Sequence, residues 1–182
     1  MKIAIIKSLV DAHTLGISSF SSILDECGVD VTIADDSISR AVEFLYDPKA
    51  KTDLKKWLLK NKPTSIGFSH RLDPMKGAEL FKRLADFVKK DADLSGLRLI
   101  FAGLPPACQK IQQDCPYAVM IFSGDETPYE ALLKFGVPKA DIPRWLVDDN
   151  TYDSDRISFG KSIIDKANPI SPARPLRPIL CI

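Results

Sequence analysis

The sequence predicts a doubly wound α/β domain built around a five-stranded parallel sheet. Five short apolar runs recur between residues 3 and 122, and each has the length of a buried strand. Segments with apolar residues at helical spacing separate these runs, and such alternation of strand and helix is typical of a parallel sheet. Glycine, proline or an N-cap residue stands at most of the junctions, where the chain has to turn.

The first strand is predicted at residues 3–6, and a polar turn carrying Asp11, His13 and Gly16 follows it. Apolar residues between positions 15 and 27 then recur at spacings of two to four, which indicates an amphipathic helix. Strand, turn and helix in this order form the first half of a βαβ unit. In an open parallel sheet, ligands bind at the carboxyl ends of the strands. This turn is therefore the first candidate site.

The other strands share a short apolar run after a turn and are predicted at residues 29–34, 64–69, 97–102 and 117–122. The helices between and after them share an apolar stripe and are predicted at residues 37–46, 51–60, 74–90, about 105–113 and about 128–135. The last strand is almost continuously apolar, which predicts burial on both faces. Five such strands joined by right-handed crossovers predict a flavodoxin-like, three-layer fold with strand order 2-1-3-4-5.

Three polar residues are predicted to begin helices as N-caps, namely Ser37, Asp73 and Thr127. Proline follows two of them, at Pro74 and Pro128, and proline suits the first helical turn.

The end of the chain differs from residues 1–137, which form the predicted domain. Residues 138–182 are predicted to be an extension or linker, with a helix at about 155–167 and a proline-rich end. The final apolar residues resemble the start of a strand. We expect either that a downstream domain follows or that this tail packs back on its own sheet or on a partner.

Composition excludes several classes of function. A net charge of +1 indicates neither a nucleic-acid partner nor an acidic membrane surface. No apolar run approaches the length of a membrane span, and the N-terminus lacks the layout of a signal peptide. The four cysteines form no Cys-x-x-Cys motif, which favours a reduced, cytoplasmic protein.

Residues 11–16, Asp-Ala-His-Thr-Leu-Gly, resemble the Asp-x-His-x-x-Gly fingerprint of cobalamin-binding domains, as in methionine synthase, methylmalonyl-CoA mutase and corrinoid proteins. The resemblance implies that His13 is the lower axial ligand of cobalt and that Asp11 hydrogen-bonds its other ring nitrogen. Imidazole suits a transition metal, a carboxylate fixes its tautomer, and Gly16 admits a bulky ligand. The alternative is an ordinary surface loop, in which Asp11 or Thr14 helps to start the helix.

Further partial matches to this family, which together cover residues 1–137, lie at the carboxyl edge of the predicted sheet. Ser69 matches the serine of the family's Ser-x-Leu motif, although Arg71 stands where leucine is expected. Ala102-Gly103 matches a Gly-Gly pair over which, the resemblance implies, the nucleotide tail passes. Gly124, after the last strand, is expected to allow a similar close approach.

Other residues on this edge have simpler interpretations. His70 is expected on the same rim, either against an amide arm of the corrin or, more simply, in solvent. Asp125 and Glu126 fall in a segment that loosely resembles one in cobalamin domains preceding radical-SAM domains, but a helix-capping sequence is the preferred interpretation. Leu9 replaces a glycine of the mutase version, which weakens a mutase assignment.

The resemblance implies a module that holds methylcobalamin or adenosylcobalamin base-off. The sequence shows no nucleophile–base pair and no paired carboxylates, so no catalytic residues are predicted within it. It would serve a methyltransferase, a mutase or a radical-SAM enzyme, with the substrate held by another catalytic or substrate-binding domain or subunit. Two alternatives remain. One is a flavodoxin-like regulatory or interaction module without a cofactor, and the other is an N-terminal fragment of a cobalamin-dependent radical-SAM enzyme. A cleft beside the first strand that is open, rather than filled by side chains, would favour the cofactor.

Overall fold

The computed structural model describes residues 1–9, 14–147 and 161, and the chain divides into two units, Met1–Pro143 and Arg144–Ile182. This division lies a few residues after the boundary predicted at 137. The second unit contributes α7 (Arg144–Val147) to the described residues. The helix predicted at 155–167 and the proline-rich end lie outside them, apart from residue 161. Within the described part of the chain, no helix is long and apolar enough to cross a membrane.

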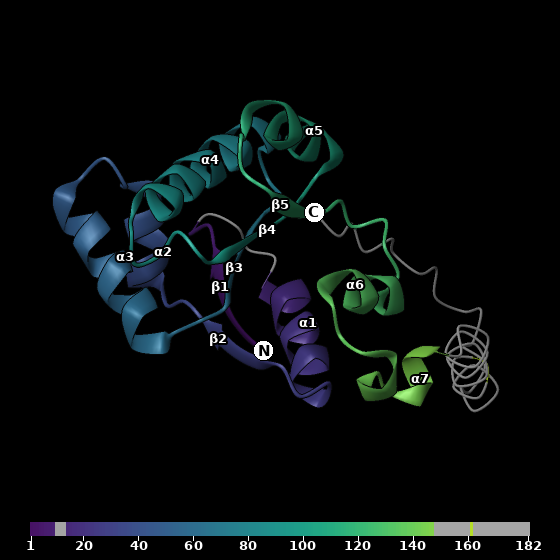
Figure 1. Ribbon diagram of the computed structural model, residues 1–182. Coiled ribbons are helices and arrows are strands. Elements are labelled where there is room, and N and C mark those ends of the chain that lie inside the picture. Colours follow the sequence, from purple (N-terminus) through teal and green to yellow (C-terminus); the bar gives the residue numbers. More distant parts are fainter. Residues whose placement is uncertain (10–13, 148–160, 162–182) are drawn as a thin grey trace, which may run out of the picture. The chain divides into compact units, whose positions relative to one another are not determined.

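The first unit contains a five-stranded parallel sheet in the order β2-β1-β3-β4-β5, which confirms the predicted flavodoxin-like fold (Figure 1). The strands are β1 (Lys2–Lys7), β2 (Asp30–Ile33), β3 (Ser65–His70), β4 (Arg98–Gly103) and β5 (Val119–Phe122). In the central register, Ile5 pairs with Gly67 and Gly67 pairs with Ile100. These three residues therefore lie side by side across β1, β3 and β4.

Helices cover both faces of the sheet. Helices α1 and α6 lie on one face, and α2 to α5 lie on the other (Figure 1). Their bounds are α1 (Thr14–Glu26), α2 (Asp36–Glu43), α3 (Pro48–Asn61), α4 (Pro74–Lys90), α5 (Pro105–Asp114) and α6 (Pro128–Phe135), with a 3₁₀ turn η1 (Lys139–Asp141) after them.

Two helix starts differ from their predicted positions. Helix α2 is capped by Asp35, whose carboxylate accepts hydrogen bonds from the Ile38 amide at 3.0 Å and the Ser37 hydroxyl at 2.6 Å. Ser37 is therefore inside the helix and is not its N-cap. Helix α3 begins at Pro48, three residues early, because Asp47 caps it by accepting from the Lys49 amide at 2.8 Å.

The other predicted caps are confirmed. Asp73 accepts from the amides of Met75 and Lys76 at 2.9 and 3.1 Å and so begins α4. Thr127 begins α6 in a capping box with Glu130, in which each side chain bonds the other's backbone amide.

The two faces of the sheet differ in how completely they are covered. On the face under α2 to α5, Phe68, Phe81 and Phe101 form an aromatic cluster with ring centroids 5.1 to 6.5 Å apart, and all three are almost fully buried. Strand β5 is only half-buried along its whole length, contrary to the prediction of burial on both faces. Strand β5 is an edge strand, and the cleft described next opens beside it.

Candidate functional site

A cavity of about 420 Å³ opens on the face of the sheet that α1 and α6 cover. Its floor is formed by residues of the three central strands, including Ile3, Ile5 and Ile100. Its walls come from the two helices, and Phe20 of α1 meets Phe135 of α6 edge to face with ring centroids 6.5 Å apart. We call this cavity, between α1, α6 and the sheet, the cleft. It is an open, largely apolar slot beside the first strand.

The structure brings together the predicted site residues that it describes. They come from α1, β3, β4 and the turn after β5, and all of them line the cleft: Gly16, Ser69, Ala102, Gly103 and Gly124. Asp11 and His13, the predicted hydrogen-bond partner and cobalt ligand, lie outside the described residues.

Ser8 and Leu9, the last described residues before Asp11 and His13, are held by a side chain of α2. The Glu43 carboxylate accepts hydrogen bonds from the Ser8 hydroxyl and the Leu9 amide, both at 3.1 Å. Glu43 belongs to α2, so the end of the described segment after β1 is tied to a helix far along the chain. Sequence reasoning missed Glu43, because nothing near it in sequence indicates its partners.

The cleft has an open floor because β3 carries a glycine at its centre. A Cβ on Gly67 would lie 3.4 Å from Cδ1 of Ile3 and 3.9 Å from Cγ1 of Ile5, so any larger side chain would enter the cleft. Sequence reasoning missed Gly67. Its signal was nevertheless present, because a glycine inside an apolar strand often marks a place where a ligand approaches the backbone.

Two small residues, Ala102 and Gly103, end β4, and the core as well as the cleft limits their size. Ala102 and Gly103 both line the cleft. A Cβ on Gly103, however, would lie 2.6 Å from the Phe101 ring and 3.0 Å from the carbonyl oxygen of His70. The core under α4 and α5 therefore requires glycine at 103 whatever occupies the cleft.

His70 is buried, contrary to the expectation that it would be solvated at the rim. It is 1% exposed, and its Nε2 accepts a hydrogen bond from the Asp73 amide at 3.2 Å. Its ring packs on Gly77 of α4, where a Cβ would come within 2.7 Å of Cδ2. Alternation along β3 explains this, because Ser69 faces the cleft and the next side chain must face the opposite layer.

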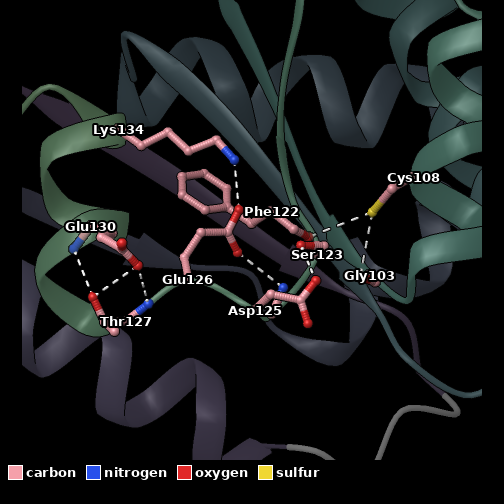
Figure 2. A network of polar contacts seen from close by, with 10 residues as sticks. Gly103, Cys108, Phe122, Ser123, Asp125, Glu126, Thr127, Glu130 and Lys134 are labelled. Atoms are coloured by element: carbon pink, nitrogen blue, oxygen red, sulfur yellow. Dashed lines mark hydrogen bonds and ion pairs between the residues drawn. The ribbon is translucent and has the colours of Figure 1, made fainter.

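Three polar side chains line the cleft within the described part of the chain: Ser69, Arg71 and Glu126. Glu126 accepts from the Gly124 amide at 3.0 Å and pairs with Lys134 at 2.6 Å, while Lys134 also lies 4.9 Å from the centre of the Phe122 ring (Figure 2). Burial tends to raise the pKa of Glu126, but the Lys134 hydrogen bond and backbone amides outweigh it, so the pKa lies below its ordinary value.

Acidification is expected to remove the stabilising contribution of this ion pair. Because the pKa of Glu126 is lower in the folded protein than its ordinary value of 4.5, the contribution is present above that value and is lost as pH falls through the folded pKa. Thermal melting of Glu126→Gln should therefore show a smaller loss of Tm on acidification than the native protein. Asp53→Asn, an exposed carboxylate on α3, is the control. Equal acid sensitivity of native protein and Glu126→Gln would contradict this prediction.

Cys108 contacts the carboxyl ends of two strands beside the cleft. Its thiol is buried and contacts the carbonyl oxygens of Gly103 at 3.5 Å and Phe122 at 3.7 Å, which links the ends of β4 and β5 (Figure 2). Burial, followed by the charge of Glu126, raises the pKa of the thiol. Burial and a raised pKa are typical of a structural cysteine.

None of the described residues that line the cleft is a histidine, cysteine or lysine, and no group of three or more His, Cys, Asp or Glu side chains that could hold a metal ion occurs in this part of the chain. The sequence matches no model of a known protein family, and it matches no curated protein. The function is therefore inferred from the cleft and from the sequence motif.

Proposed function

We propose that this chain binds cobalamin, with the nucleotide tail in the cleft and His13 as the lower axial ligand of cobalt. One observation carries the proposal. The described residues that match the cobalamin-binding pattern come from four separate segments, and every one of them lines the same cavity. An ordinary surface Asp-His pair would not require a cavity beside it.

The shape and chemistry of the cleft fit such a tail. A volume of about 420 Å³ lies within the usual range of ligand pockets. Isoleucine and phenylalanine side chains on the floor and walls can bury a flat apolar ring such as the lower base of cobalamin. Gly16 leaves open space, since a Cβ there would meet no atom within 4 Å. These residues would bind and orient the tail and exclude water from it.

The bound cobalt would supply methyl transfer or radical generation, and another domain or subunit would hold the second reactant. Within this chain, Asp11 would fix the tautomer of His13, and Glu43 would hold the start of their turn through Ser8 and Leu9. The open cleft weighs against the alternative of an interaction module without a cofactor. A three-cysteine cluster motif downstream in the parent gene would favour the radical-SAM alternative, which uses the same cleft.

The test is retention of a corrinoid with a direct readout of the cobalt ligand. Purified protein would be mixed with hydroxocobalamin or methylcobalamin, freed of excess, and compared with His13→Ala by visible spectroscopy. In the reduced Co(II) form, the electron paramagnetic resonance spectrum reports the axial nitrogen. Protein labelled with ¹⁵N-histidine should change the nitrogen splitting from a triplet to a doublet, and His13→Ala should lose the doublet.

The outcomes separate the candidate functions. A triplet in the labelled protein would show that the corrinoid's own base remains on cobalt, which would exclude His13 as the ligand. If the native protein retains no corrinoid at micromolar concentrations, the proposal fails. The flavodoxin-like interaction module would then be the better interpretation.

A further inference from the structure

Arg71 gives the mouth of the cleft a charged group that the family pattern does not contain. It lies in the turn after β3, where the pattern has leucine, and it lines the cleft while remaining exposed to solvent. The floor and walls beneath it are largely apolar. A cation at the entrance of an apolar slot favours a ligand that has an apolar end and an anionic group beside it.

The guanidinium of Arg71 reaches the turn after β5. A Cβ built on Gly124 would overlap Nη2 of Arg71 and would lie 3.4 Å from Cζ. Strand β4 separates the two turns, because Ser69 pairs with Ala102 and Ala102 pairs with Phe122. Arg71 therefore spans the end of β4 at the mouth, and Gly124, with a φ of +89°, leaves space for it.

The mouth of the cleft carries charges of both signs. The carboxylate of Glu126 pairs with Lys134 of α6 and accepts a hydrogen bond from the Gly124 amide. Arg71 adds a positive charge to this rim. A guanidinium has five N–H donors in a planar fork, so it can bind phosphate in a bidentate manner while keeping other contacts.

We propose that Arg71 binds the phosphodiester of a nucleotide-tailed ligand whose apolar ring occupies the cleft. This inference rests on the proposed function and adds a specificity-determining residue to it. The cleft would then select corrinoids that carry a phosphate-linked tail over corrinoids that lack one. Arg71 would act on binding and not on the reaction at cobalt.

The test compares ligands that differ in the phosphate. Affinities of cobalamin and of cobinamide, a corrinoid without the nucleotide, would be measured for native protein, Arg71→Leu and Arg71→Lys. Arg71→Leu should weaken cobalamin binding about tenfold or more and leave cobinamide binding unchanged, whereas Arg71→Lys should restore part of the loss. Arg83→Leu is the matched control, since Arg83 is a half-buried residue of α4 that pairs with Glu79 and does not line the cleft.

A second pair of ligands, which lack the corrin and its cobalt, tests whether Arg71 binds the phosphate. α-Ribazole 3′-phosphate, the detached tail, should bind native protein more tightly than unphosphorylated α-ribazole, and raising the salt concentration should reduce this difference. Both effects should vanish in Arg71→Leu. Equal losses for cobalamin and cobinamide, or no preference for the phosphorylated tail, would overturn the role of Arg71. Failure of the native protein to retain any corrinoid would instead overturn the proposed function, and the tail pair alone would then decide the role of Arg71.

Discussion

Gly67→Leu is expected to abolish corrinoid retention while leaving the protein folded. Position 67 lies in the floor of the cleft between Ile5 and Ile100, and a Cβ there makes only ordinary contacts with Ile3 and Ile5. A leucine side chain would therefore extend into the open slot and occupy space needed by the ligand. We expect an affinity at least about a hundredfold lower, because the apolar ring could no longer enter.

The test measures both corrinoid affinity and thermal stability for two variants whose side chains at position 67 increase in size. Gly67→Ala adds one methyl group and should reduce affinity less than Gly67→Leu does. Gly96→Leu is the control, because Gly96 is exposed and a Cβ there meets no atom within 4 Å. If Gly67→Leu remains folded and binds as the native protein does, the cleft is not the binding site.

Phe101→Ala is expected to lower the free energy of unfolding by about 3–5 kcal/mol, the usual cost of removing a buried phenylalanine. The Phe101 ring is fully buried, and its centroid lies 5.1 Å from that of Phe81 and 6.5 Å from that of Phe68. Its removal would leave a cavity in the core that supports β3 and β4 from behind. Urea denaturation would measure the change, with the exposed Phe44→Ala as a control of much smaller effect.

The same ring explains the glycine at the end of β4, and a double-mutant cycle can check this. Gly103→Ala alone should destabilise the protein by about 1–3 kcal/mol, because its methyl group would collide with the Phe101 ring. In the Phe101→Ala background the same substitution should cost less, because only the contact with the His70 carbonyl oxygen remains. Strictly additive effects would show that the two positions do not interact.

Local sequence signals identified the elements well but placed some of their ends incorrectly. Asp73 and Thr127 were recognised as caps because each precedes a proline that suits the first helical turn. At α2, Asp35, Asp36 and Ser37 are three adjacent candidates, and composition does not choose among them. Asp35 caps the helix because its backbone is extended there and its carboxylate reaches the Ile38 amide.

Whether a side chain is buried depends on what covers the face of the sheet to which it points. The apolar run in β5 predicted burial on both faces, yet β5 is an edge strand beside an open cleft. His70 was expected in solvent because the third strand was predicted to end at Ser69, which places His70 in the turn after it. It is buried because alternation along β3 directs it toward α4.

The sequence by itself determined the strand order and the set of small residues at the carboxyl edge. Both follow from local information, namely the alternation of apolar runs with helical stripes and the residues that end each strand. Only the tertiary structure decided that the cleft is open, that Gly67 forms its floor, and that Arg71 meets Gly124 across β4. These features depend on contacts between residues far apart in the chain, and strand register and helix packing set such contacts.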